Sequence, residues 1–269
     1  MSHYFWKMKH LFQFVALAAG LFLLWPASVL HACEPPVCWG TGVLPIDGAK
    51  VPENLKHVLT WAEEPPKLQR TSGNNGGHIK VVHESKGHDV HLTKIAEGWK
   101  VGEKIRAESK TCKYMANGFP ANWTIVASAP LPKKLGSLSI KTHKKSDLKV
   151  STNVGSCDVT IEADQVTIAL NLHPSAQPWM DVFHFQTLVD GKKWRPSKTI
   201  HERSYGQSWE GRGKERLFSD CKKDSEANDN LSAGKHSVVL LATLPGMKQE
   251  WRTEAIEVNL SCDGAASPK

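Results

Sequence analysis

Histidines gather in one short stretch, where four of them fall within His78–His91. The polar sequence Glu84–Gly87 in its middle is typical of a hairpin turn, with a strand pattern on either side. A hairpin across that turn would place His83 opposite His88, and facing imidazoles bind Cu or Zn when a third ligand approaches. The candidates for that third ligand are His57 and Asp89. The alternative, which we favour, is that these are solvated histidines near strand ends, so that the chain holds no metal.

Aromatic side chains beside arginine are a second source of binding chemistry. The polar, glycine-bearing stretch Tyr205-Gly-Gln-Ser-Trp209-Glu-Gly-Arg212 carries two aromatic rings and a guanidinium. Such groups stack on sugars or fill a pocket of a partner. The alternative, again the favoured one, is a loop that folds back with its rings packed beneath it. Tyr205, Trp209 and Arg212 are therefore the candidate ligand contacts.

The other tryptophans divide by their sequence context. Trp61 and Trp99 fit core positions on strands, whereas Trp179 and Trp251 lie in polar or proline-bearing contexts that are typical of loops. We therefore expect the first two to be buried and the last two to lie in connecting segments.

Motifs of catalysis are missing from the sequence. It contains no Gly-x-Ser-x-Gly elbow, phosphate-binding loop, His-Glu-x-x-His helix or Gly-x-Gly-x-x-Gly turn. Serine, histidine and aspartate are plentiful, but a catalytic triad is defined by geometry that a sequence does not contain. The sequence predicts no catalytic residue, no cofactor and a role that is not enzymatic, with an unrecognised hydrolase as an alternative.

The N-terminus has the pattern of a secretory signal peptide. Lys7 and Lys9 precede the apolar run Leu11–Leu24, and Ala32 offers a small residue for cleavage. The run is shorter than the ~20 apolar residues that a bilayer span needs, which disfavours an uncleaved anchor. The sequence therefore predicts a signal peptide over 1–32, export to the periplasm or cell surface, and no transmembrane segment in the mature chain.

Six cysteines follow that segment: Cys33, Cys38, Cys112, Cys157, Cys221 and Cys262. An even number in an exported chain indicates three disulfides, and a metal site is disfavoured because no Cys-x-x-Cys pair occurs. The connectivity is open; strand direction favours Cys221–Cys262, proximity favours Cys33–Cys38, and Cys112–Cys157 is left. Leu30-His31-Ala32-Cys33 also resembles a lipoprotein cleavage box. Lipidation of Cys33 is disfavoured because an odd number of cysteines would remain.

The charge of the mature chain is mildly positive. Cleavage after residue 32 removes two lysines and no acid, so the net charge is 34 − 2 − 27 = +5 with neutral histidines. The surplus is spread over lysine pairs, whereas nucleic-acid binders concentrate their charge on one element. The pairs are Lys133-Lys134, Lys144-Lys145, Lys192-Lys193 and Lys222-Lys223. We predict no nucleic-acid partner; an envelope protein or a polysaccharide remains open.

Strands must position all these residues, because no sustained helical period is present. The last hairpin is the clearest: the run Lys235–Leu244 is apolar on both faces, as in a fully buried strand, and Pro245-Gly246 breaks it at a turn. The return strand alternates, with inward side chains at Ile256, Val258 and Leu260. Before this hairpin, the pattern predicts strands over 138–141, 158–161, 165–172 and 182–189. The polar stretch 196–230 is too long for a simple connection and is expected to hold edge strands or a functional loop.

The stretch Pro130–Gly136 is the best domain boundary, since its prolines make a stiff linker between two runs of strand pattern. The sequence therefore predicts an all-β chain with domains over 33–132 and 136–264. Near the start of the first domain, Pro45-x-Asp47-Gly48-x-x-Val51-Pro52-x-Asn54 resembles the opening of bacterial immunoglobulin-like domains of exported and S-layer-type cell-surface proteins. That resemblance implies two immunoglobulin-like β-sandwich domains.

The resemblance says little about activity, because such domains serve mostly as spacers, adhesive modules or appended binding units. It implies a non-enzymatic binding or structural module of the bacterial cell envelope. Periplasmic copper carriers share this type of fold and the Pro-x-Asp-Gly-Ala sequence, so a copper- or zinc-binding protein that uses the His78–His91 hairpin is the alternative. Their N-terminal histidine ligand would require cleavage after Leu30, which is a poor site.

Overall fold

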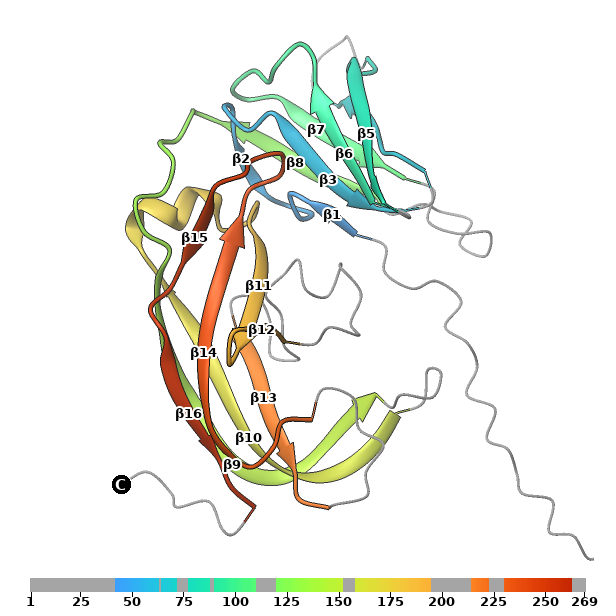
Figure 1. The fold of residues 1–269 in the computed structure, drawn as a ribbon. Coiled ribbons are helices and arrows are strands. Elements are labelled where there is room, and N and C mark those ends of the chain that lie inside the picture. The colour runs from blue at the N-terminus through green and yellow to red at the C-terminus, as the bar shows by residue number, and fades with distance from the viewer. Residues whose placement is uncertain are drawn as a thin grey trace, which may run out of the picture. The chain divides into compact units, whose positions relative to one another are not determined.

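The computed structural model describes residues 42–262 except 63, 72–76, 88–89, 110–119, 152–157, 195–213 and 223–229. The described chain is almost entirely β-structure (Figure 1), which confirms the all-β prediction. Its helical element is one 3₁₀ turn, η1 (Pro174–Trp179). In this part of the chain no helix has the length and apolar character needed to cross a membrane. The predicted signal peptide lies outside the described residues.

Strands that precede residue 127 form two four-stranded sheets. In one sheet the order is β1 (Gly42–Leu44), β3 (His57–Trp61), β6 (Val90–Ile95) and β5 (Val81–Gly87). In the other the order is β2 (Lys50–Pro52), β8 (Ala121–Val126), β7 (Lys104–Glu108) and β4 (Lys67–Arg70), and β2 runs parallel to β8. Alternate side chains of both sheets are buried in the same packed group, for example Val58 and Trp123. This follows from the two-residue period of a strand.

Strands from residue 136 onward form two further sheets. The first has the order β13 (Lys214–Asp220), β10 (Asp158–Leu172), β9 (Gly136–Ser151). The second has the order β12 (Lys192–Lys193), β11 (His184–Val189), β14 (Gly234–Thr243), β15 (Glu250–Arg252), and β16 (Ile256–Leu260) also pairs with β14.

The long hairpin of β9 and β10 differs from the prediction. The sequence predicts short strands over 138–141, 158–161 and 165–172, but β9 has 16 residues and β10 has 15. Glu162 and Asp164 interrupt the sequence of apolar side chains. The strand nevertheless continues, because the completely buried Asp164 has hydrogen-bonding partners in His143 and Ser261. A register shift between Thr167 and Ile168 accommodates the extra length of β9.

The final hairpin confirms one expectation and corrects another. Pro245-Gly246 forms the expected turn, and Val258 and Leu260 point inward. The β14 strand, however, is buried on one face only: His236, Val238, Leu240 and Ala242 are buried, while the side chains between them are partly or fully exposed. An apolar run is therefore not sufficient for two-sided burial, because one face of this antiparallel sheet is left partly open.

Two tryptophans expected in connecting loops are instead core residues. Trp179 is fully buried in η1 and Trp251 is 5% exposed in β15. Their indole nitrogens donate to the linker, Trp179 Nε1 to the carbonyl of Pro130 at 2.9 Å and Trp251 Nε1 to that of Pro132 at 2.7 Å. Trp61 and Trp99 are buried as predicted. The proline linker is thus held in place by hydrogen bonds and is not a free spacer.

Candidate functional site

Several residues predicted to bind ligands or form disulfides lie outside the described part of the chain. They are Tyr205, Trp209 and Arg212, His88 and Asp89, and Cys33, Cys38, Cys112 and Cys157. The site is therefore built from the described residues that remain.

The histidine hairpin has a different register from the predicted one. The expected turn Glu84–Gly87 is part of β5, and the ladder places His83 opposite Thr93. Val81 likewise pairs with Ile95. The backbone of these residues continues the edge strand β5 and does not turn.

His83 and His91 each lie within hydrogen-bonding distance of a protein oxygen. His83 Nδ1 lies 2.9 Å from Thr93 Oγ1, and His91 Nε2 lies 3.0 Å from the carbonyl oxygen of Ala62. Burial and then the nearby His91 lower the pKa of His83. Among the residues that the structure describes, no three His, Cys, Asp or Glu side chains are grouped closely enough to hold a metal ion.

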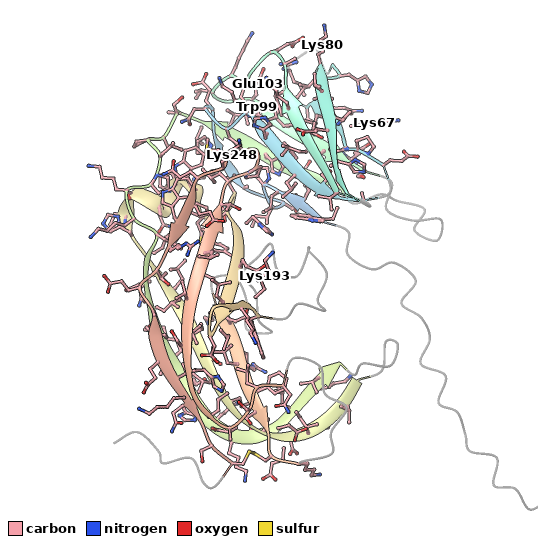
Figure 2. The ribbon with its side chains drawn as sticks, viewed as in Figure 1. Lys67, Lys80, Trp99, Glu103, Lys193 and Lys248 are labelled. Atoms are coloured by element: carbon pink, nitrogen blue, oxygen red, sulfur yellow. A yellow bond between two sulfur atoms is a disulfide. The ribbon has the colours of Figure 1, made fainter. Side chains whose placement is uncertain are left out.

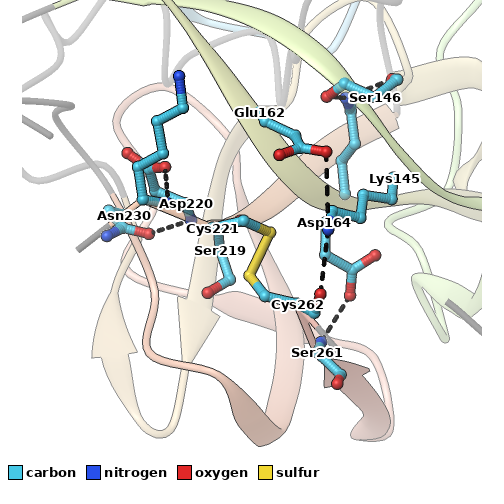
Figure 3. The surroundings of a disulfide bond; sticks show 12 residues. Lys145, Ser146, Glu162, Asp164, Ser219, Asp220, Cys221, Asn230, Ser261 and Cys262 are labelled. Atoms are coloured by element: carbon cyan, nitrogen blue, oxygen red, sulfur yellow. Dashed lines mark hydrogen bonds and ion pairs between the residues drawn. A yellow bond between two sulfur atoms is a disulfide. The ribbon is translucent and has the colours of Figure 1, made fainter. Parts of the chain in front are cut away.

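The Cys221–Cys262 disulfide marks one end of the second pair of sheets (Figure 3). It joins the residue after β13 to a residue just past β16, with the two Cα atoms 5.2 Å apart. This is the pair that the strand directions predict, since antiparallel β14 and β16 bring the end of the last strand beside the start of β14. The disulfide therefore links the two sheets of this half.

A buried carboxylate lies beside the disulfide. Asp164 on β10 is 0% exposed; its carboxylate accepts from the backbone N–H of Ser261 at 2.6 Å and lies 3.0 and 3.1 Å from His143 Nε2. Lys145 Nζ donates to the carbonyl of Cys262 at 3.1 Å, as Figure 3 shows. An uncompensated buried carboxylate would be costly, so these donors are needed for Asp164 to be inside. The network fixes the end of β16 against β9 and β10.

A second histidine–carboxylate pair lies at the turn between β11 and β12. Asp190-Gly191 forms the predicted turn, with φ of 51° and 76°. The carboxylate of Asp190 lies 2.7 Å from His236 Nδ1 and accepts from the backbone N–H of Ser237 at 2.8 Å. The other ring nitrogen of His236 faces the carbonyl of Ser232 at 2.8 Å. Both ring nitrogens face acceptors, so only the imidazolium can donate to both.

Residues 133–149 carry six exposed lysines. We call this set the basic edge; its members are Lys133, Lys134, Lys141, Lys144, Lys145 and Lys149, all exposed. Four of them lie on β9, which is the edge strand of its sheet. In the sequence Lys133-Lys134 and Lys144-Lys145 are separate pairs, but the first precedes β9 directly and the second lies on it.

No protein-family model matches the chain, and a search of curated proteins finds no match. The histidine–aspartate pairs hold strand ends and turns in place, and the basic edge presents lysines to the surroundings.

Proposed function

We propose that this protein is an exported, non-enzymatic binding or structural module of the bacterial cell envelope. The observation that carries the proposal is the Cys221–Cys262 disulfide, because such bonds persist in oxidising compartments outside the cytosol. The signal-peptide pattern over 1–32 supports the same compartment. Attachment through lipidated Cys33 is the less favoured version of the proposal.

The arrangement of the polar side chains supports a module without catalytic chemistry. The Asp164 carboxylate is completely buried, and its partners are a neighbouring histidine and the backbone of the last strand. Asp190 and His236 pair in the same way across a turn. Both carboxylates thus have a clear structural use, which is to position strands.

We further propose that the halves 33–132 and 136–264 are two immunoglobulin-like modules. The support is that strands up to residue 126 pair among themselves and strands from residue 136 pair among themselves. Differential scanning calorimetry of the mature chain tests this. Two transitions support independent modules, whereas a single cooperative transition for the whole chain contradicts them.

Cell fractionation with mass spectrometry tests the proposed location. We expect the protein in the periplasmic or surface fraction, with an N-terminus at Cys33 and disulfide-bonded cysteines. A cytoplasmic protein that begins at Met1 and has free thiols would overturn the proposal. A diacylglyceryl mass on Cys33 would establish the anchored version.

Metal titration tests the main competing function. The mature protein is titrated with Cu²⁺ and Zn²⁺ beside a His83→Ala/His88→Ala variant. We expect no stoichiometric binding that depends on these two histidines. Stoichiometric binding at micromolar metal that the double variant loses would replace the proposal with a metal-binding function.

A further inference from the structure

Strand β10 anchors the chain at both ends of the Cys221–Cys262 disulfide through contacts that do not involve sulfur (Figure 3). The backbone N–H of Cys221 donates to the carbonyl of Glu162 at 2.9 Å. Two residues further along β10, the carboxylate of Asp164 accepts from the backbone N–H of Ser261 at 2.6 Å. One strand therefore holds the backbone at the first cysteine and directly before the second.

The anchor before Cys262 lies beyond the regular pairing of β16. The ladder between β14 and β16 ends at Leu260. The next backbone N–H, that of Ser261, donates to the side chain of Asp164. Lys145, which lies opposite Asp164 on β9, donates to the carbonyl of Cys262 at 3.1 Å. These two side chains thus continue the attachment of the chain as far as the cysteine itself.

The burial of Asp164 is explained by this contact. A completely buried carboxylate costs free energy unless its oxygens accept hydrogen bonds, and its partners here are His143 and Ser261. An apolar side chain would fill the same position at a lower cost but would offer no acceptor to the N–H of Ser261. The carboxylate therefore has a specific effect, which is to hold the backbone next to Cys262.

The two cysteines need such anchors in order to pair with each other. They are separated by 41 residues in the sequence, and the six cysteines of the chain allow many other connectivities. Their Cα atoms lie 5.2 Å apart, within the range of about 4.4–6.8 Å that a disulfide requires. Contacts that hold this spacing without the sulfur atoms raise the effective concentration of one thiol at the other.

We propose that Asp164 is a positioning residue that directs Cys221 to pair with Cys262 when the disulfide forms. The oxidant is another disulfide compound. The thiolate of one cysteine attacks it to form a mixed disulfide, and the thiolate of the other cysteine then displaces that bond. The two electrons of the cysteine thiols and, through the solvent, their two protons pass to the oxidant, which leaves as two thiols. The inference rests on the proposed function only because export is what exposes the chain to such oxidants.

Reoxidation of the native protein tests the proposal. The mature protein is reduced with dithiothreitol without denaturant, transferred to a buffer of reduced and oxidised glutathione, and alkylated at successive times. Non-reducing peptide mapping then gives the ratio of the Cys221–Cys262 link to all other links of Cys221. We expect the Cys221–Cys262 link to dominate in the wild type. The same ratio is measured after refolding of the reduced chain from guanidinium chloride, so that a variant that does not stay folded while reduced still gives a result.

Two substitutions of the buried carboxylate should have different effects on this ratio. Asp164→Ala should lower it about tenfold, because the hydrogen bond of Ser261 to a charged acceptor is lost. Asp164→Asn keeps an oxygen that accepts from Ser261, and it should lower the ratio by no more than about threefold.

Matched controls separate positioning from a general loss of stability. Val166→Ala removes buried atoms from the same strand and should destabilise the protein, but it should leave the ratio of links unchanged. Lys145→Ala removes the donor to the carbonyl of Cys262 and should lower the ratio about threefold. Lys193→Ala changes an exposed lysine on β12 in the same half (Figure 2) and should have no effect.

Three results would overturn the inference. They are a wild-type protein in which Cys221 links mainly to other cysteines, an unchanged ratio in Asp164→Ala, and equal losses in Asp164→Ala and Val166→Ala. The last result would show that Asp164 acts only through overall stability. These measurements use the purified protein, so a cytoplasmic location in the cell would refute the proposed function and leave this inference standing.

Discussion

The carboxylate of Asp190 lies 2.7 Å from Nδ1 of His236, a side chain that is 6% exposed, and this pair ties the turn after β11 to the start of β14. Burial disfavours the charged imidazole, but the hydrogen bonds to Asp190 and to the carbonyl of Ser232 outweigh it and raise the pKa of His236. The hydrogen bond from His236, with that from Ser237, lowers the pKa of Asp190. Lys192, also close to Asp190, adds to this lowering.

This pair predicts a pH dependence of stability. The raised pKa of His236 contributes stability that is complete below about pH 6.5, its unfolded value, and is lost as pH rises through the folded pKa. The lowered pKa of Asp190 contributes stability that is lost as pH falls below about 4. Asp190→Asn should therefore reduce the free energy of unfolding most between about pH 4 and 6.5. We expect about 1 kcal/mol, allowing for solvent screening at the half-exposed carboxylate.

Urea unfolding of the wild type and Asp190→Asn from about pH 4 to 9 measures this effect. Asp147→Asn changes an exposed acid elsewhere in the same half and is the control. Its loss of unfolding free energy should not be largest between about pH 4 and 6.5. A stability difference that grows as pH rises would contradict the prediction.

Asp164 and His143 should be energetically coupled. Asp164→Ala leaves the N–H of Ser261 and the ring of His143 without their acceptor, and we expect a loss of about 3 kcal/mol. His143→Ala removes one donor from the buried carboxylate and should cost about 2 kcal/mol. The double variant should cost less than the sum by at least about 0.5 kcal/mol, as for contacting residues.

Chemical denaturation of the two single variants and the double variant provides this cycle. Glu162→Ala removes an exposed acid from the same strand and should change stability by no more than about 0.5 kcal/mol. Additive losses would show that the histidine and the carboxylate act independently.

The Cys221–Cys262 disulfide should contribute substantially to stability. It closes a loop with a sequence separation of 41 residues. Constraint of the unfolded chain by such a loop is worth about 4 kcal/mol, against about 2 kcal/mol for a Cys33–Cys38 loop. Cys262→Ser should therefore destabilise the protein more than Cys38→Ser in urea unfolding.

Non-reducing peptide mapping checks the disulfide pairs directly. We expect linked peptides for Cys221–Cys262, together with the predicted Cys33–Cys38 and Cys112–Cys157 pairs. A Cys157–Cys262 peptide would contradict the structure, and a Cys38–Cys112 peptide would contradict the predicted connectivity.

The indole groups that bond to the linker should be sensitive to a conservative change. Trp179→Phe and Trp251→Phe keep most of the buried ring but remove the donors to Pro130 and Pro132. We expect each to cost about 1–2 kcal/mol more than Trp99→Phe. Trp99 is equally buried, and its Nε1 has no hydrogen-bond partner in the part that the structure describes. Equal losses for all three variants, measured by urea unfolding, would show that the linker bonds contribute nothing.

The sequence by itself determined the all-β class, many of the strand positions and the turns at Asp190-Gly191 and Pro245-Gly246. These features depend on local properties: the two-residue period of apolar side chains and the few residue types that turns favour. The alternation of Val258 and Leu260 in β16 is of this kind, and the direction of that strand was enough to predict the Cys221–Cys262 pair.

Only the tertiary structure decided which polar side chains are buried. It also decided whether a strand continues past such a residue. Asp164 interrupts the apolar pattern of β10, and its burial depends on His143, 21 residues away, and Ser261, 97 residues away. The burial of Trp179 and Trp251 also depends on distant partners, Pro130 and Pro132. A free-energy cost that is offset by residues far along the chain leaves no local pattern, and for that reason these features could not be predicted from the sequence.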